Sequence, residues 1–341
     1  MATSKGTVLG IIALIIGMSG LGLGVFTFLK PQVIEEPLGI EYPVSSEKEI
    51  NEALDAIGTG YGIITITNTI TLNGTITIDS GGNYIIQGAG AIIKCASNQR
   101  AIYITNSTSL TIQNIKIDAT ALTELSLNII QIEEANDNHI YVKNVQIFGD
   151  DNIMGFGISI NSDNVWVSEC YFYKVRTGIW QSTGEKAHIS DNIIDDCSEF
   201  GIRLEGSNNF IDGNLITYVF IGIFADYNAH YNSISNNIIY FFRWHGIRII
   251  SENNTIVGNY IKDVQLNTGT MQGIVIDGSY NTINGNGCYN IKSTPIDIGF
   301  GINIMGGANN TVVGNTCLFN DNPFLASGSA TNTYVSGNQF Y

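Results

Sequence analysis

The sequence predicts an all-β fold, a single-stranded right-handed parallel β-helix of about a dozen coils. The first observation is a phrase that recurs six times between Ala187 and Cys317, with successive copies 22, 23, 22, 27 and 29 residues apart. The second is that its apolar residues are mostly β-branched and alternate with polar ones. The third is another phrase, Gly-Ile-x-apolar-x in close variants, which occurs seven times from Gly157 to Gly301. A strand-like repeat of this length predicts a solenoid in which each period forms one coil, stacked about 4.8 Å above the previous one.

The N-terminal residues 1–29 are predicted to be a short tail and a transmembrane anchor. The run from Thr7 to Leu29 carries no charge and would span about 34 Å as a helix, enough to cross a bilayer. A cleaved signal peptide is the alternative, but no small-x-small cleavage site follows the run. Residues 30–45 are rich in Pro and Glu, which predicts an extended linker. The β-helix domain is then expected over residues 46–341.

A cap helix is predicted over residues 46–57. Ser46 and Glu49 have the spacing of a capping box, the apolar residues Ile50, Leu54 and Ile57 share one helical face, and Gly58 follows. Such a helix would cover the open first coil, which otherwise exposes apolar side chains and an unpaired strand edge. A helix lying on a membrane is the alternative, although its polar face is mainly acidic.

The late asparagine of each copy of the first phrase is expected at a bend between two strands. There its side chain can bond the backbone and the equivalent amide of the next coil, which would form a ladder. Asparagine is also a common turn residue without any ladder, but seven in one slot favour the ladder. They are Asn192, Asn214, Asn237, Asn259, Asn286, Asn315 and Asn338. The residues three before and two after each, mostly Ile, are expected to point inward, because a coil buries its apolar face only against its neighbours.

In the second phrase, the Ile is expected to point inward and the following residue outward. One outer row then contains Ser159, Trp180, Arg203, Phe224, Arg248, Val275 and Asn303. A second row, two residues further along each strand, contains Asn161, Ser182, Glu205, Asp226, Ile250, Asp277 and Met305. We call these two rows together the outer strip.

These repeats resemble the pectate-lyase-like superfamily of right-handed parallel β-helix proteins, in the form with short Asn-Asn-x-Ile-x-Gly-Asn repeats. The resemblance extends from Gly60 to the C-terminus. Its members include polysaccharide lyases, glycoside hydrolases, uronate epimerases, phage tailspikes and adhesins, so the resemblance implies the fold and leaves the activity open. The Gly-His-Gly and Arg-x-Lys motifs of polygalacturonase-like hydrolases are missing, since His245 follows Trp244 and no Arg-x-Lys occurs.

Composition limits the partners. The net charge of −15 argues against nucleic acid and anionic lipid surfaces. The acidic body and four sequons, at Asn73, Asn106, Asn253 and Asn309, favour an extracellular β-helix domain on a single-pass cell-membrane protein. Five cysteines do not make a disulfide framework, and buried free thiols are favoured over a bridge, even for Cys288 and Cys317 in neighbouring coils.

No metal site is predicted, because the four histidines lack the spacing of zinc or copper ligands. The cofactor is left unknown. Calcium is the alternative, if the coils bring the pair Asp150 and Asp151 close to the pair Asp195 and Asp196.

The outer strip carries the candidate site. Aromatic rings can contact sugar rings, Arg pairs with carboxylates, and two acids can divide general acid and base work. The candidate catalytic residues are Glu205, Asp226, Arg203, Arg248 and His245. The candidate substrate-binding residues are Trp180, Phe224, Asp277 and Asn303. The competing interpretation is a solvated face stabilised by cross-strand pairs and cation–π contacts.

The predicted function is that of a membrane-anchored cell-surface protein that binds extracellular or cell-envelope polysaccharide. Cleavage of that polysaccharide, by a lyase or glycoside hydrolase activity, is left open. The alternative is a structural or adhesive surface protein without catalytic activity. Because the last coil ends at Phe340 and Tyr341 with no cap, such a protein could assemble as a homo-oligomer through that end.

Overall fold

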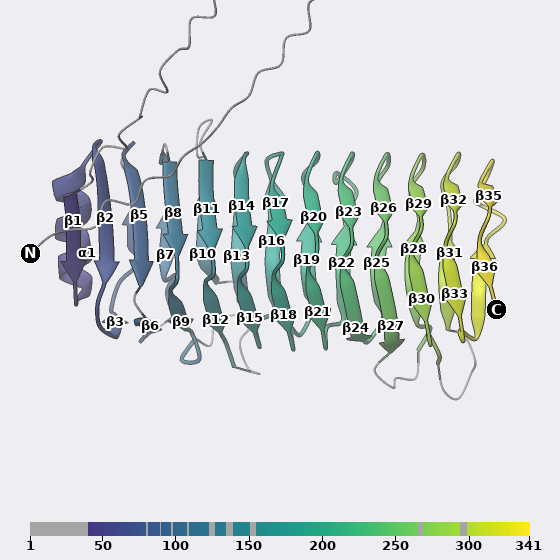
Figure 1. The fold of residues 1–341 in the computed structure, drawn as a ribbon, viewed down its shortest axis with the longest axis horizontal. Helices are drawn as coiled ribbons and strands as arrows, with labels where there is room; N and C mark the ends of the chain where they lie inside the picture. Colours follow the sequence, from purple (N-terminus) through teal and green to yellow (C-terminus); the bar gives the residue numbers. More distant parts are fainter. Residues whose placement is uncertain are drawn as a thin grey trace, which may run out of the picture. The chain divides into compact units, whose positions relative to one another are not determined.

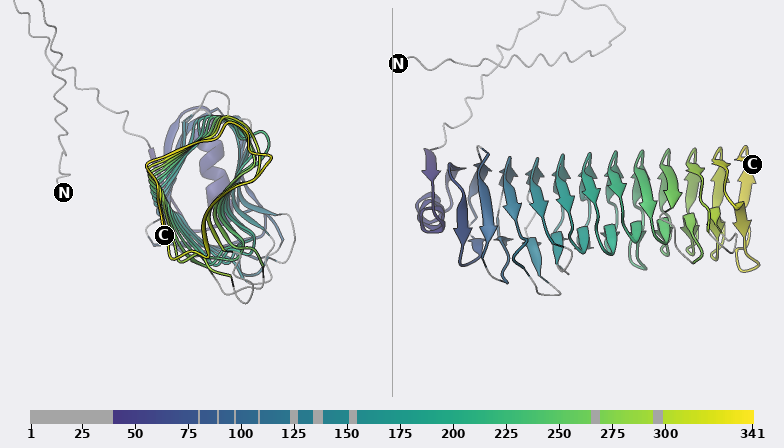
Figure 2. Two further views of the ribbon diagram at one scale, coloured as in Figure 1. Left: turned by 90° about the vertical axis from the view of Figure 1, so that its right-hand side faces the viewer. Right: turned by 90° about the horizontal axis from the view of Figure 1, so that it is seen from below.

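The computed structural model describes residues 40–341, except 80, 89, 97, 108, 123–126, 134–138, 151–154, 265–268 and 294–298. The described chain forms a solenoid whose coils each contribute one strand to each of three parallel sheets (Figure 1). Seen along the solenoid axis, successive coils superpose around a common interior (Figure 2). The predicted parallel β-helix of about a dozen coils is therefore confirmed.

The three sheets are named in the order in which a coil visits them. Sheet A contains β1 (Ile40–Val44), β2 (Tyr61–Ile66), β5 (Asn83–Gly88), β8 (Ser109–Gln113), β11 (His139–Lys143), β14 (Val165–Ser168), β17 (His188–Ser190), β20 (Phe210–Asp212), β23 (Ser233–Ser235), β26 (Thr255–Val257), β29 (Thr282–Asn284), β32 (Thr311–Val313) and β35 (Tyr334–Ser336). Sheet B contains β3 (Ile70–Leu72), β6 (Ile92–Cys95), β9 (Lys116–Asp118), β12 (Gln146–Phe148), β15 (Tyr171–Tyr173), β18 (Ile193–Asp195), β21 (Leu215–Thr217), β24 (Ile238–Phe242), β27 (Tyr260–Val264), β30 (Gly287–Tyr289), β33 (Thr316–Leu318) and β36 (Gln339–Phe340). Sheet C contains β4 (Ile76–Ile78), β7 (Ile102–Ile104), β10 (Asn128–Glu133), β13 (Phe156–Asn161), β16 (Thr177–Thr183), β19 (Phe200–Leu204), β22 (Ile221–Ala225), β25 (His245–Ile249), β28 (Gln272–Ile276), β31 (Phe300–Ile304) and β34 (Asn322–Ala326).

The core is built from the predicted inward columns. Equivalent residues of successive coils pair in register, so that each buried side chain lies against its own kind above and below. The column of sheet A comprises Ile189, Ile211, Ile234, Ile256, Ile283 and Val312, and all are fully buried. The column of sheet B comprises Ile194, Ile216, Ile239, Ile261, Cys288 and Cys317, which are fully buried as well. The described cysteines are free and buried, as predicted.

The predicted asparagine ladder runs along the bend between sheets A and B. Each side-chain amide donates to the Oδ1 of the next asparagine, at 2.9–3.0 Å, from Asn192 to Asn338. The backbone N–H of each residue donates to the same oxygen at 2.8–3.0 Å. Burial of these amides would be costly without such partners, so the ladder both closes the bends and fixes the register.

A second ladder, which was not predicted, runs along the bend between sheets C and A. It consists of Asn209, Asn232, Asn254, Asn281 and Asn310, which open the copies of the first phrase. The backbone N–H of each donates to Oδ1 of the next at 2.8–2.9 Å. The signal was present in the sequence, because these asparagines recur with the same spacing as the late ones.

The glycine of the Gly-Ile phrase is explained by two close contacts, one with the next strand of sheet C and one with a side chain of sheet B. A Cβ added at Gly222 would lie 2.4 Å from the carbonyl oxygen of Gly246 and 2.7 Å from Cγ2 of Ile239. A Cβ at Gly201 would meet Gly222 and Ile216 in the same way, at 2.6 Å each. Only glycine fits this column without moving the backbone.

The cap helix is confirmed as α1 (Glu47–Ile57), which packs against the first strands of all three sheets. The backbone N–H of Glu49 donates to Oγ of Ser46 at 3.3 Å, but the Glu49 carboxylate accepts from the backbone of Ser45 (2.6 Å) rather than of Ser46. The apolar face with Ile50 and Leu54 is buried, and along the axis α1 lies across the outline of the coils (Figure 2). Residues 40–44, placed in the predicted linker, form β1 and pair with β2.

The transmembrane helix in the predicted fold class is corrected. In the part of the chain that the structure describes, no helix is long and apolar enough to cross a bilayer, and α1 has 11 residues. The segment predicted to cross the membrane, residues 7–29, lies outside the described residues.

Candidate functional site

The first row of the outer strip is in register along sheet C. Trp180 on β16, Arg203 on β19, Phe224 on β22 and Arg248 on β25 are directly paired neighbours. The row continues at one end to Ser159 on β13. Its side chains, about 23 residues apart in the chain, thus lie about 4.8 Å apart along the solenoid.

The acids of the second row follow directly after these strands. The backbone N–H groups of Glu205, Asp226 and Asp277 donate to carbonyl oxygens of the preceding coil at 2.8–2.9 Å. The hydrogen bonding of the sheet therefore extends one residue beyond the strand ends and fixes the backbone positions of the three acids. They lie on the same face as Arg203 and Arg248, which confirms the predicted placement of the two rows side by side.

A third row consists of the residues that precede the glycine of each Gly-Ile phrase, and of these His245 alone was predicted as part of the site. These residues also pair in register from coil to coil. Aromatic members contact the strip: the Phe156 ring lies 4.7 Å from Trp180 and the Phe200 ring 5.3 Å from Phe224, between centroids. The constant position before Gly is the sequence signal that could have identified this row.

Arg203 is the centre of the site. Its Nη2 lies 2.7 Å from Oε1 of Glu205 and 3.0 Å from Oδ2 of Asp226. Trp180 Nε1 donates to the same Oε1 of Glu205 at 3.0 Å. The guanidinium carbon also lies 5.5–5.9 Å from the ring centres of Trp180, Phe200 and Phe224. One cation is thus held by two carboxylates and three rings, which matches the cation–π contacts of the competing interpretation.

Arg248 repeats this arrangement two coils further on. Its Nη2 lies 3.3 Å from Oδ2 of Asp277, and its guanidinium carbon lies 5.3 Å from the Trp244 ring and 6.0 Å from the Phe224 ring. The charged side chains of the two clusters remain 21–27% exposed, so a ligand can still reach them. The ion pairs are only partly shielded from water, and each stabilises the fold weakly.

His245 begins β25 and is almost completely buried, with 2% of its surface exposed. Its ring stacks on Trp244 with the centroids 4.2 Å apart. Burial, and then the charge of Arg248, lowers the pKa of His245 to about 3. The imidazole is therefore neutral near pH 7 and cannot supply a proton there as a general acid.

The two ends of the first row differ from its centre, whereas Met305 at the end of the second row is exposed. Ser159, Val275 and Asn303 face outward but are buried by their neighbours, and Asn303 Nδ2 donates to Oε1 of Gln272 at 3.0 Å. Asn303, predicted to bind substrate, thus has little surface to offer. The accessible part of the strip extends from Trp180 to Arg248 and includes Asp277.

Buried side-chain atoms without a hydrogen-bond partner gather on sheet C. Among the described residues they include Gln131 Oε1, Ser159 Oγ, Thr177 Oγ1, Arg203 Nε, His245 Nδ1, Arg248 Nε and Asn303 Oδ1. Such groups are rare in folded proteins, and each one calls for a water, a ligand or a functional reason. Their concentration on the face that carries the outer strip supports this face as the functional one.

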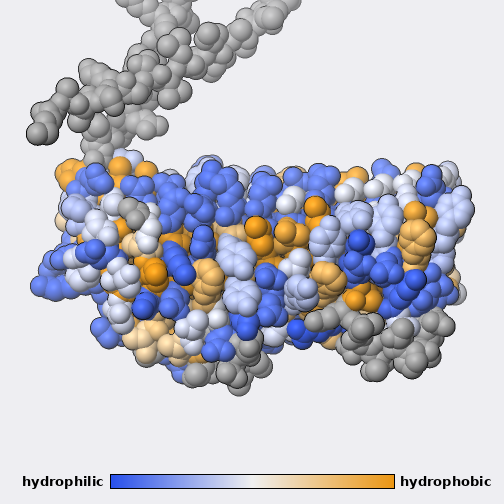
Figure 3. Space-filling model, turned by 60° about the horizontal axis from the view of Figure 1, so that its bottom comes forward, coloured by the Kyte–Doolittle hydropathy of each residue, from blue (hydrophilic) through white to orange (hydrophobic). Residues whose placement is uncertain are grey.

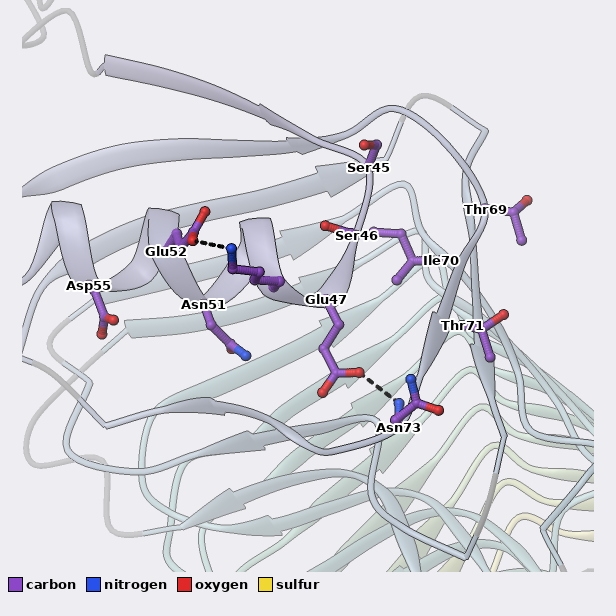
Figure 4. A pocket seen from close by; sticks show the side chains of 11 residues that line it. Ser45, Ser46, Glu47, Asn51, Glu52, Asp55, Thr69, Ile70, Thr71 and Asn73 are labelled. Atoms are coloured by element: carbon purple, nitrogen blue, oxygen red, sulfur yellow. Dashed lines mark hydrogen bonds and ion pairs between the residues drawn. The ribbon is translucent and has the colours of Figure 1, made fainter.

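A hollow of about 620 Å³ lies elsewhere, between α1 and the turn after β3 (Figure 4). Its acids already serve the cap: Glu47 Oε2 accepts from the backbone N–H of Asn73 at 2.7 Å, and Glu52 pairs with Lys48 at 3.2 Å. The hollow is open to water and results from how the helix packs on the first coil. We assign it no ligand.

The described residues contain no group of three or more His, Cys, Asp or Glu side chains that could hold a metal ion. Of the four acids in the calcium alternative, Asp151 lies outside the described residues, and Asp195 Oδ1 accepts from the Thr217 hydroxyl at 2.6 Å.

On the face shown in Figure 3, hydrophobic residues form separate spots among hydrophilic ones. Among the described residues on that face, these spots do not join into a continuous apolar patch of the kind that marks a protein interface.

A family model described as a right handed beta helix region matches residues 128–271. No curated protein matches the sequence. Among solved structures, the A-module of the mannuronan C-5 epimerase AlgE6 from Azotobacter vinelandii is 15% identical with a TM-score of 0.61, over 86% of this chain and 93% of that one. A mannuronic acid specific polysaccharide family 6 lyase from human gut microbiota is also 15% identical, with a TM-score of 0.63, over 87% and 80%. A tailspike protein of E. coli bacteriophage HK620, in complex with a pentasaccharide, is 12% identical with a TM-score of 0.57, over 88% and 64%. At such identities these likenesses show the shared fold alone.

Proposed function

Because this chain is a right-handed parallel β-helix repeat protein with the pectate-lyase-like fold, we propose that it binds polysaccharide along the accessible part of the outer strip. The observation that carries the proposal is the in-register line of Trp180, Arg203, Phe224 and Arg248 on successive coils. An extended chain that follows the solenoid axis would contact each of them in turn. The epimerase, lyase and tailspike neighbours support this, since their names state a polysaccharide or oligosaccharide ligand.

The side chains of the strip provide the contacts that a sugar chain requires. Guanidinium N–H groups and carboxylate oxygens form charge-assisted hydrogen bonds, which are stronger than neutral ones. The rings of Trp180 and Phe224 are half-buried and offer apolar edges next to those polar groups. Because the sheet fixes every backbone position, the site needs little ordering when a ligand binds.

The test is a glycan array probed with the full-length protein. Trp180→Ala, Arg203→Ala and Arg248→Ala should each weaken binding about tenfold or more, as for central contacts of other interfaces. Trp166→Ala is the matched control, because Trp166 is a half-buried tryptophan in the stack of rings on sheet A. Circular dichroism would verify that each variant is folded. A wild-type protein that binds no glycan, or strip variants that bind as well as wild type, would refute the proposal.

Cleavage of the bound polysaccharide stays a prediction. Glu205 and Asp226 are the candidate acid and base, yet both are paired with Arg203. If they are catalytic, Glu205→Gln and Asp226→Asn should retain binding while the release of shorter chains stops. Release of chains at the wild-type rate from both variants would exclude these roles.

The second candidate is a structural or adhesive surface protein without catalytic activity. One observation favours it: the charge of each arginine of the strip is paired with acids of the strip, which is sufficient to explain the arginines as stabilising residues. It predicts that Arg203→Ala lowers stability and that no glycan binds. Assembly into a homo-oligomer is checked by light scattering of the full chain, and the extracellular location stays a prediction from composition and sequons.

A further inference from the structure

We infer that the ligand of the outer strip is a neutral glycan and not a polyanion. The inference rests on the proposed function, because it narrows the chemical class of the ligand bound at that same site. It draws on two independent features of the described residues. One is the balance of charge on the strip, and the other is a set of aromatic residues at the adjoining bend.

The charge balance of the accessible strip is negative. Its two cations are Arg203 and Arg248, and its three anions are Glu205, Asp226 and Asp277, which leaves one excess negative charge. His245 adds no positive charge near pH 7, because burial keeps it neutral. The whole chain carries −15, so the long-range field also repels anionic polymers.

A carboxylate on the ligand would have to compete with the acids already in place. Arg203 Nη2 contacts both Glu205 and Asp226, within 3.0 Å. If a uronate took this guanidinium, at least one of those carboxylates would lose its cation while remaining largely covered. Exchanging one carboxylate for another therefore yields no net ion pair and adds a repulsion between like charges.

A neutral sugar meets no such penalty. Its hydroxyls can donate to the carboxylate oxygens and accept from the guanidinium N–H groups without breaking the ion pairs. Its apolar C–H groups can contact the aromatic rings between the charged clusters. The same pairs that exclude a polyanion thus become donors and acceptors for an uncharged chain.

Four aromatic residues extend this surface at the bend between sheets B and C. They form two ring pairs, Tyr218 with Phe241 at 4.9 Å and Phe220 with Trp244 at 5.3 Å between centroids. Trp244 joins them to the strip, since the guanidinium of Arg248 lies over its ring. Tyr218 is 40% exposed, so this bend presents aromatic surface to the solvent.

The backbone at this bend holds two of the four aromatic residues in a left-handed conformation. Tyr218 and Phe241 have φ angles of 55° and 53°, a left-handed conformation that bulky side chains adopt at a cost in free energy. The equivalent positions of the next two coils carry Asp263 and Asn290, residues that tolerate this conformation better. Lys174 and Phe319 occupy the same column in other coils with φ of 54° and 60°, so this conformation alone assigns no role. What the bend adds to the strip is the stacked pair of Tyr218 and Phe241, whose aromatic surface a ligand can contact.

The test compares two panels of polysaccharides matched in length, one neutral and one of polyuronates, by calorimetry or on an array. The full-length protein should bind at least one neutral chain, with less than about a twofold change in Kd between low salt and about 1 M salt, where the Debye length is roughly 3 Å. No polyuronate should bind at either salt concentration. Binding of a polyuronate that weakens with salt would overturn the inference and leave the proposed function intact. Failure of both panels to bind would refute the proposed function itself.

A variant at the bend separates recognition from a structural role. Phe241→Asn keeps a residue that accepts the left-handed backbone, so the urea midpoint should stay the same or rise. The affinity for the neutral chain should nevertheless fall by about tenfold. Asp263→Asn, at the equivalent bend of the next coil, is the matched control and should bind as wild type. Unchanged binding by Phe241→Asn would remove the bend from the site.

Discussion

Replacing one asparagine in the middle of the first ladder should destabilise the protein far more than replacing its neighbour. Asn237 is fully buried, and its side chain makes four hydrogen bonds. Nδ2 donates to the carbonyl of Ile211 (3.0 Å) and to Oδ1 of Asn259 (2.9 Å), while Oδ1 accepts from N (3.0 Å) and Nδ2 (2.9 Å) of Asn214. Asn237→Ala removes all four and leaves the buried backbone N–H of Asn214 without this partner.

The expected loss follows from these contacts. Each hydrogen bond stabilises the folded state by about 1 kcal/mol, so the loss of four bonds should cost about 4 kcal/mol, and the stranded N–H of Asn214 can only add to this loss. Asn236→Gly is the matched control. Asn236 is the adjacent residue and exposed, with φ of 53°, a conformation that Gly adopts freely. Its change should stay below about 1 kcal/mol.

Urea unfolding of the full chain, followed by circular dichroism, measures both variants. Midpoints should be compared together with the slopes, because a solenoid can unfold in parts and two-state behaviour is not guaranteed. If the ladder were only a consequence of turn composition, both variants would lose the same small amount. Equal midpoints for Asn237→Ala and Asn236→Gly would therefore refute the argument that stacked amides hold the coils together.

Three further changes test other parts of the fold. Gly222→Ala places a Cβ 2.4 Å from the carbonyl oxygen of Gly246 and should lose about 1–3 kcal/mol in urea unfolding, whereas Gly328→Ala, with nothing within 4 Å, should be neutral. His245 has a folded pKa of about 3, below its unfolded value, so its contribution is present above about pH 6.5 and is lost as the pH falls towards 3. Wild type should therefore lose about 2 kcal/mol more than His245→Gln between pH 7 and pH 5, and parallel losses would contradict its burial as a neutral ring. Ser46→Ala removes the helix N-cap and should lower the thermal midpoint by the equivalent of about 1 kcal/mol, unless the Ser45 contacts alone hold the helix start.

The repeat could be predicted from the sequence because every coil needs the same inward apolar residues and the same bend asparagines at the same spacing. Residues equivalent to Asn214 and Ile216 recur 22 residues before and 23 residues after them in the sequence. This spacing alone predicts the ladder, the inward columns and the register of the strands. The cap helix followed from local signals, Ser46 at its start and Gly58 at its end. The second ladder was not predicted although its asparagines are as regular, because an asparagine at the start of a strand is also explained by turn formation alone.

The details of the site could not be predicted in the same way. The accessibility of a side chain in a row depends on neighbours that do not follow the repeat. The burial of Ser159 and Asn303 therefore could not be predicted from the sequence. The ion pairs of Arg203 depend on rotamers, and a pattern of residue types carries no information on them. The low pKa of His245 depends on Trp244 covering its ring, which the sequence places next to it but does not orient.

The register of sheet C fixes the distance between equivalent side chains along the solenoid axis. Arg203 and Arg248 are separated by two coils, about 10 Å at 4.8 Å per coil, and hydrogen bonds between strands prevent that interval from stretching. If the repeat length of a bound polymer divides evenly into this distance, equivalent groups of the polymer can contact both arginines. With any other repeat length, a group placed at one arginine leaves a different group at the other. Affinity measured against ligands of increasing length should then rise in steps for a commensurate chain. A smooth rise would show that the spacing exerts no selection.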